Sequence, residues 1–125
     1  MSGFAGTGRA TLLRENQQVF LWQNEPVAAG TLSAAYELAR VSRSFYPWGL
    51  SVEVKFSANP GAFEIDLMAA NNDSAANYYQ IGSITTANAA NVGRWDMPAG
   101  VWPKYVAGLV KTLTNAVNTT LQVTR

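Results

Sequence analysis

The chain has 125 residues, a length typical of one domain, and it contains neither cysteine nor histidine. It therefore forms no disulfide, and it has no thiolate nucleophile, no imidazole base and no cysteine or histidine ligand for zinc. Nine Lys and Arg balance eight Asp and Glu without forming a basic cluster, so we expect no nucleic-acid partner. Only 14% of residues are charged and 48% are hydrophobic, which is typical of a large β core or of an apolar surface covered by partners.

The N-terminal sequence predicts an arm rather than a folded element. Residues 1–9 contain Gly3, Gly6 and Gly8 around Phe4, a composition too flexible to specify a helix or strand. We expect residues 1–9 to be a flexible Gly-rich arm and residues 10–125 to form a single domain. The arm lacks the apolar core of a signal peptide and no 18-residue apolar run follows, so we expect synthesis in the cytoplasm and no membrane partner.

The next part of the chain favours short strands. Residues 10–14 and 19–22 are β-prone and are separated by a polar stretch at 15–17, which predicts a β-hairpin. The sequence Asn-Glu-Pro at 24–26 is expected to break the chain. Residues 31–41 allow both a helix and a strand, and we favour a strand.

The most regular pattern lies at residues 50–67. Apolar and polar residues alternate on both sides of Pro60 and Gly61, which suit the second and third positions of a type II turn. The pattern predicts a β-hairpin whose apolar faces match. The expected cross-strand pairs are Phe56 with Phe63, Val54 with Ile65, Lys55 with Glu64, and Glu53 with Asp66.

The C-terminal half continues the series of strands, which we expect at residues 77–84, 91–97 and 119–125. Residues Tyr105–Leu113 have the apolar spacing of a helix entered at Pro103, but Gly108 and the β-branched neighbours favour a strand. About eight or nine short strands with a turn signal roughly every ten residues predict an all-β fold. The expected architecture is an antiparallel β-sandwich of jelly-roll type.

The predicted register places Glu53, Glu64 and Asp66 on one polar face. Such carboxylates are compatible with the acid and nucleophile of a glycosidase, or with a Ca²⁺ site that also uses Asp73. An ordinary solvated face with Lys55 between the acids fits better, because no EF-hand loop and no further catalytic group accompany them. We therefore expect no enzymatic activity, no cofactor and no metal site.

Aromatic residues are concentrated just before the central strands. They could fill the core, anchor a protein interface, or form a stacking platform for sugar rings. The aromatic residues considered for these roles are Phe45, Tyr46, Trp48, Trp95 and Trp102. Of the three roles we favour the interface, with Phe4, Phe45, Tyr46 and Trp48 as the candidate partner-binding residues.

Four stretches within residues 40–125 are similar to a known class of proteins, namely RVSRSFYPWGLSVEVKFSANPGAFEIDLMAAN, ANYYQIGSITT, RWDMPAGVWPKYV and NAVNTTLQVTR. They resemble the small virion structural proteins of tailed bacteriophages, and most of all the jelly-roll decoration, or cement, proteins. The resemblance implies a protein on the outer capsid surface of a virion that binds the major capsid protein, bridges its subunits and self-associates as a dimer or trimer. It brings no catalytic residues. The alternative function is a carbohydrate-binding, lectin-like module on a virion or tail.

Overall fold

The computed structural model of the chain describes residues 11–13, 18–33, 35–38, 50–72, 74–97 and 103–124. This part of the chain forms nine β-strands and one short 3₁₀ helix, and it contains no α-helix. The elements are β1 (Thr11–Leu13), β2 (Gln18–Pro26), β3 (Tyr36–Leu38), β4 (Ser51–Phe56), β5 (Phe63–Ala70), η1 (Ala75–Asn77), β6 (Tyr79–Ile84), β7 (Val92–Asp96), β8 (Tyr105–Leu113) and β9 (Asn118–Thr124).

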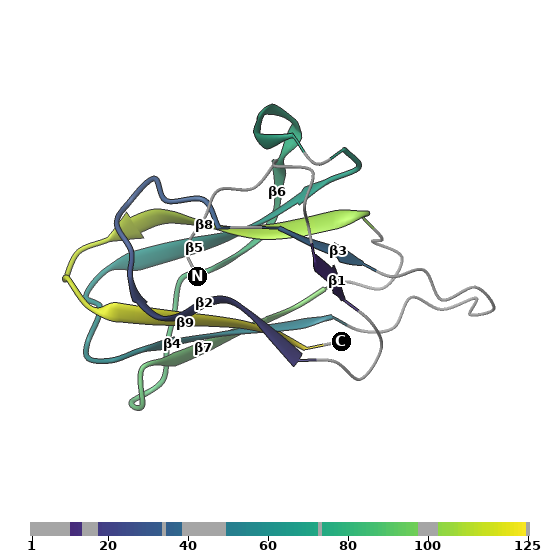
Figure 1. Cartoon of the computed structure of the whole chain (residues 1–125). Coiled ribbons are helices and arrows are strands. Elements are labelled where there is room, and N and C mark those ends of the chain that lie inside the picture. The colour runs from purple at the N-terminus through teal and green to yellow at the C-terminus, as the bar shows by residue number, and fades with distance from the viewer. Residues whose placement is uncertain are drawn as a thin grey trace.

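The strands form two sheets that lie face to face (Figure 1). One sheet has the order β1-β3-β8-β5-β6 and the other has the order β2-β9-β4-β7. Every ladder is antiparallel except the one that joins β1 to β3. Without β1, the eight remaining strands follow the order of a jelly roll, in which the chain passes repeatedly between two four-stranded sheets. The predicted jelly-roll β-sandwich is confirmed.

The core lies between the two sheets and is built by the alternation seen in the sequence. In β4, Val52, Val54 and Phe56 are buried while Glu53 and Lys55 are exposed. The other strands supply further inward residues. The largest fully buried side chains include Trp22, Phe56, Leu21, Ile65 and Leu121. The period-2 pattern therefore predicted correctly which face of β4 is buried.

The predicted central hairpin is wrong, although both of its strands exist. Strand β4 pairs with β7 and β9, whereas β5 pairs with β6 and β8, so the connection between them crosses from one sheet to the other. Phe56 and Phe63 still meet, but across the core, with ring centroids 4.7 Å apart in an edge-to-face arrangement. Gly61 has the expected positive φ of 68°. The apolar faces of β4 and β5 pack against each other across the core instead of forming one continuous face of a single sheet.

The predicted N-terminal hairpin is also wrong. Strand β1 pairs in parallel with β3, and β2 pairs with β9 at the other end of the sequence. Strand β2 does not end at residue 24 but continues to Pro26, with register shifts between Phe20 and Glu25. Asn24 adopts a positive φ of 48° within this irregular part, a conformation that asparagine tolerates better than most residues.

Residues Tyr105–Leu113 form a strand, as predicted, and this strand lies between β3 and β5. Gly108 is buried and faces the core, where a Cβ atom would collide with Leu121 of the opposite sheet. The glycine that weakens a helix here serves close packing between sheets. Residues 31–41 likewise contain a strand, β3, which continues the ladder along β8 from a bridge between Leu32 and Leu109.

Candidate functional site

The aromatic residues that the sequence suggests as partner contacts fall outside the described part of the chain. These are Phe4, Phe45, Tyr46 and Trp48, and Trp102 of the sugar-platform hypothesis also lies there. Residues 1–9, predicted to be a flexible arm, are outside it as well. Their assignment as contact residues stays a prediction.

Trp95 is the member of this aromatic set that the structure places. It lies on β7, is half-buried and packs against the main core. Its indole ring lies directly over Gly82 of β6, because a Cβ atom on that glycine would overlap the ring. Trp95 therefore fills the seam where the edge strands of the two sheets meet, which is a packing role rather than an open stacking surface.

The three acidic residues expected on one face are divided between the two sheets. Glu53 lies on the exposed face of β4, level with Arg94 and Gln122. Glu64 and Asp66 lie on the outward face of β5, in the other layer. Because both strands turn their apolar faces inward, their polar faces point to opposite sides of the sandwich. The predicted pairs of Glu53 with Asp66 and of Lys55 with Glu64 are wrong, and with them the three-carboxylate site.

Glu64 and Asp66 do form a close pair on the outer face of β5. Asp66 is only 4% exposed, and its Oδ1 accepts a hydrogen bond of 3.2 Å from Gln80 Nε2. Burial, followed by the hydrogen bond and charge of Glu64, raises the pKa of Asp66 to about 6. The hydrogen bond from Asp66 and the charge of Lys111, whose Nζ is 3.6 Å from Glu64 Oε2, lower the pKa of Glu64.

This carboxyl pair has the arrangement of a structural hydrogen bond. Below about pH 6 the protonated Asp66 donates to the Glu64 carboxylate. The two carboxyl groups of a glycosidase instead flank a substrate bond, at separations of roughly 5 Å or more. Among the described residues, no group of three or more His, Cys, Asp or Glu is placed to hold a metal ion.

A second, small apolar cluster lies on the outer face of the five-stranded sheet. Ala35 and Ala107 are buried there, and Leu32, Met68 and Tyr78 pack against them. Met68 and Ala107 are register partners and point away from the core, opposite to the neighbouring Leu67. Part of the chain's high apolar content is therefore carried outside the main core.

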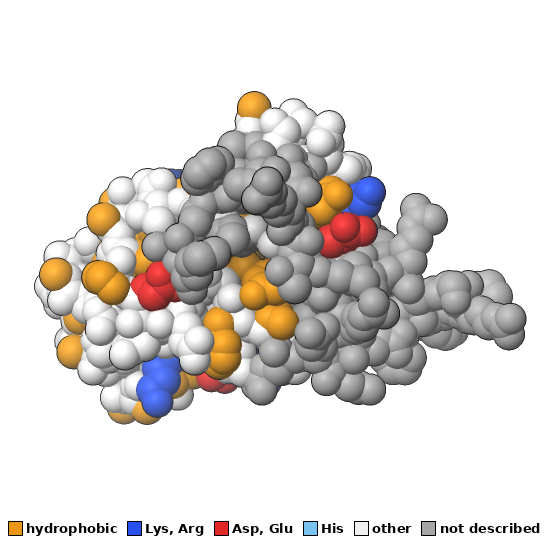
Figure 2. All heavy atoms as spheres, in the orientation of Figure 1, with side chains coloured by type: hydrophobic (Ala, Val, Ile, Leu, Met, Phe, Trp, Pro, Cys, Tyr) orange, Lys and Arg blue, Asp and Glu red, His pale blue; other side chains and the backbone are white. Residues whose placement is uncertain are grey.

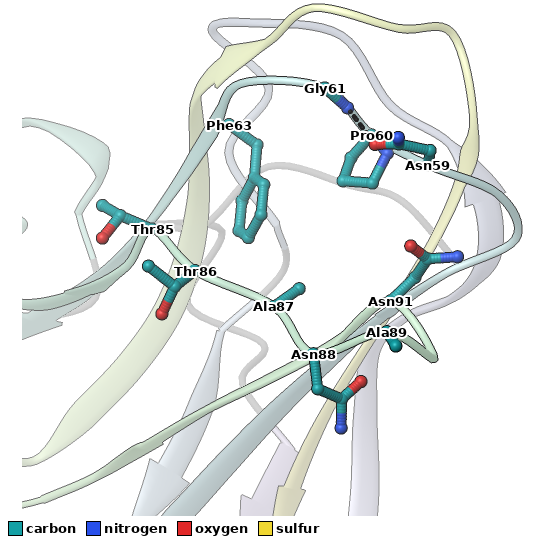
Figure 3. Close-up of a pocket in the computed structure, with 10 residues that line it drawn as sticks. All are labelled: Asn59, Pro60, Gly61, Phe63, Thr85, Thr86, Ala87, Asn88, Ala89 and Asn91. Carbon is teal, nitrogen blue, oxygen red and sulfur yellow. Dashed lines mark hydrogen bonds between the residues drawn. The ribbon is translucent and has the colours of Figure 1, made fainter.

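A pocket of about 450 Å³ opens at the end of the sandwich where the β4–β5 and β6–β7 connections meet (Figure 3). Figure 3 shows the Phe63 ring, the Ala87 methyl group and the Asn91 amide directed into it, with Pro60 and Asn59 on the opposite wall. None of the ten residues that line the pocket is charged. The pocket therefore combines an apolar floor with neutral polar groups.

This pocket could hardly be predicted from the sequence. Residues 85–90 form a Thr/Ala/Asn stretch between two predicted strands, and Asn59 directly precedes the predicted Pro60-Gly61 turn. The available signal was the concentration of Asn and Thr in two loops. That the loops meet follows from the strand order, which places the end of β6 and the start of β7 beside the β4–β5 connection.

Comparison of the chain with models of known protein families, with curated proteins and with solved structures gives no match. The fold class therefore rests on the strand order, which is that of a jelly-roll β-sandwich. In the described part of the chain, no helix has the length and apolar character needed to cross a membrane.

Proposed function

We propose that the chain is a non-enzymatic structural protein of a tailed-bacteriophage virion, a capsid decoration protein that binds the outer capsid surface and stabilises the lattice. The observation that carries this proposal is the agreement between two features of the chain. The stretches within residues 40–125 resemble jelly-roll decoration proteins, and the strand order of the chain is that of a jelly roll.

The surface composition also supports a protein partner. Only 14% of the residues are charged, and Figure 2 shows few charged side chains among the described residues of the visible face. The centres of protein interfaces are depleted in charged residues and enriched in aromatic ones. A surface that is poor in charge is therefore compatible with docking on a capsid without costly burial of unpaired charges.

The proposed mechanism is preferential binding to the assembled lattice. A ligand that binds only the assembled state stabilises it by RT ln(1 + [L]/Kd). Self-association as a dimer or trimer lets one unit contact several capsid subunits, so that modest individual affinities combine. The partners are the major capsid protein and other copies of this chain, with Phe4, Phe45, Tyr46 and Trp48 as the proposed contact residues.

The direct test compares phage particles with and without this protein. We expect particles that lack it to release their genome at a lower temperature than complete particles do, and to need more salt to stay intact. Added purified protein should restore their stability. Trp48→Ala should weaken rebinding to the particles. Tyr79→Ala, which removes a 52% exposed aromatic side chain outside the proposed contact set, is the control. Equal resistance of the two kinds of particle to heat and low salt would contradict the proposal.

The self-association part of the proposal has its own measurement. Size-exclusion chromatography with light scattering is expected to show a dimer or trimer in solution. A monomer at every concentration would contradict this part. The alternative function is a carbohydrate-binding module with an aromatic platform. Trp95, the member of that platform that the structure describes, packs between β6 and β7, and the other members lie outside the described residues.

A further inference from the structure

The pocket between the β4–β5 and β6–β7 connections has walls that are held in place by hydrogen bonds. On one side, Asn59 Oδ1 accepts from Gly61 N at 2.9 Å, and Asn115 Nδ2 donates to Asn59 O at 3.0 Å. The first bond lies within the β4–β5 connection, and the second ties that connection to the turn after β8. A binding site with fixed walls loses little conformational entropy when a ligand enters.

The opposite wall is fixed in the same way. Asn88 Oδ1 accepts hydrogen bonds from Ala90 N at 2.9 Å and Val92 N at 3.1 Å. The carbonyl of Asn91 accepts from Phe56 N at 3.0 Å, which joins this loop to β4. Asn91 keeps a positive φ of 62° within this turn. Both walls are thus formed before any ligand binds.

These bonds also decide which groups are left for a ligand. The backbone N–H groups of Gly61, Ala90, Asn91 and Val92 already donate within the loops. A peptide therefore cannot add as a strand along them. Within the described residues, the Asn91 side chain makes no hydrogen bond and its amide points into the pocket, while Asn59 uses only its oxygen.

The groups that remain favour a neutral ligand with both an apolar face and hydroxyl groups. A charged ligand would find no partner of opposite charge there, because none of the described residues that line the pocket is charged. Phe63, Pro60 and Ala87 offer an apolar floor, and the amides of Asn59 and Asn91 offer hydrogen bonds at the rim. A sugar ring presents this combination of a C–H face and a hydroxyl edge. The volume of about 450 Å³ lies within the usual range of small-molecule pockets.

We propose that this pocket binds a neutral saccharide, the terminal sugar of a glycan, with the ring against Phe63 and its hydroxyls bonded to Asn59 and Asn91. The site differs from the aromatic platform considered in the sequence. It does not depend on a capsid role, because the described residues that line the pocket come from one end of the sandwich and not from the outer sheet faces.

The test is a titration of the ¹⁵N-labelled full chain with the methyl glycosides of glucose, galactose, mannose and N-acetylglucosamine, followed by amide chemical shifts. At least one sugar is expected to give saturable shifts confined to residues 59–63 and 85–91. Absence of such shifts with all of these sugars would overturn the proposal, as would saturable shifts centred elsewhere on the chain. Tighter binding of glucuronate or of trialanine at the same residues would overturn the assignment to a neutral saccharide.

Two variants and a matched control make the assignment specific. Ala87→Leu places a larger side chain in the pocket from an exposed position, and we expect it to raise Kd about tenfold or more. Asn91→Gly removes the amide while glycine accepts the positive φ, and it should also weaken binding. Ala90→Leu makes the first substitution at an exposed residue of the same turn that does not line the pocket, so binding should persist. Unchanged affinity of both Ala87→Leu and Asn91→Gly would contradict the site.

Discussion

Among single residues, Asp66 links the stability of the fold to pH. Its pKa rises from the ordinary 3.8 to about 6, chiefly because burial disfavours the charged carboxylate. Between these two values the native state binds more protons than the unfolded state does. The free energy of unfolding contributed by this group is therefore highest below about pH 4 and decreases as the pH rises through 6.

The variant Asp66→Asn tests this linkage. Asparagine stays neutral at every pH, and its Oδ1 can still accept the hydrogen bond from Gln80. We expect the variant to be more stable than the wild type by about 1–3 kcal/mol at pH 8, where the wild type must keep a buried carboxylate ionised, and nearly equal to it at pH 4. Urea unfolding at the two pH values measures the difference. A gain that is the same at both values would show that the carboxyl charge is not its cause.

Thr119 places a polar side-chain atom inside the core. Its side chain is fully buried on β9, and its Oγ1 finds no hydrogen-bond partner among the described residues. Thr119→Val keeps the shape and replaces the hydroxyl by a methyl group, so we expect a stabilisation of about 1 kcal/mol in thermal or urea unfolding. Thr120→Val is the control, because Thr120 Oγ1 accepts from Asn24 N at 2.9 Å and its loss should destabilise. Destabilisation by Thr119→Val would mean that its hydroxyl is satisfied.

For whole elements, the sequence predicted which segments are strands and which faces of β4 and β5 are buried, but not which strands are neighbours. The alternation in β4 and β5 correctly turned Phe56 and Phe63 toward the core. It did not distinguish two strands side by side from two strands stacked across the sandwich, because both arrangements bring these rings together. A turn signal such as Pro60-Gly61 specifies a change of direction and not the sheet in which the next strand lies.

The candidate sites follow the same rule. Glu64 and Asp66 were placed correctly relative to each other, because residues two apart on one strand share a face whatever the pairing is. Glu53 was misplaced, since its relation to them depended on the pairing between β4 and β5. The proposed saccharide pocket could not be predicted from the sequence for the same reason, because residues 59 and 91 are brought together only by the order of the strands.

In the molecule as a whole, the C-terminal strand β9 is a central strand of its sheet. Strand β9 lies between β2 and β4, so both of its edges are hydrogen-bonded, and it contributes Thr119, Leu121 and Val123 to the interior. Losing one buried Leu or Val side chain usually costs about 1–5 kcal/mol, and a domain of this size is stable by only about 5–15 kcal/mol. The C-terminal strand is therefore essential to the domain.

Two truncations of equal length test how the domain is bounded. Removal of residues 117–125 deletes β9, and we expect loss of the cooperative thermal transition in circular dichroism, with recovery when a synthetic peptide of the same residues is added. Removal of residues 1–9, which the sequence predicts to be an arm, should leave that transition within a few degrees of the wild type. The first truncation opens two sheet edges and a cavity in the core, whereas the second removes residues predicted to make no part of the sandwich. A cooperative transition without β9, or its loss without the arm, would place the domain boundaries elsewhere.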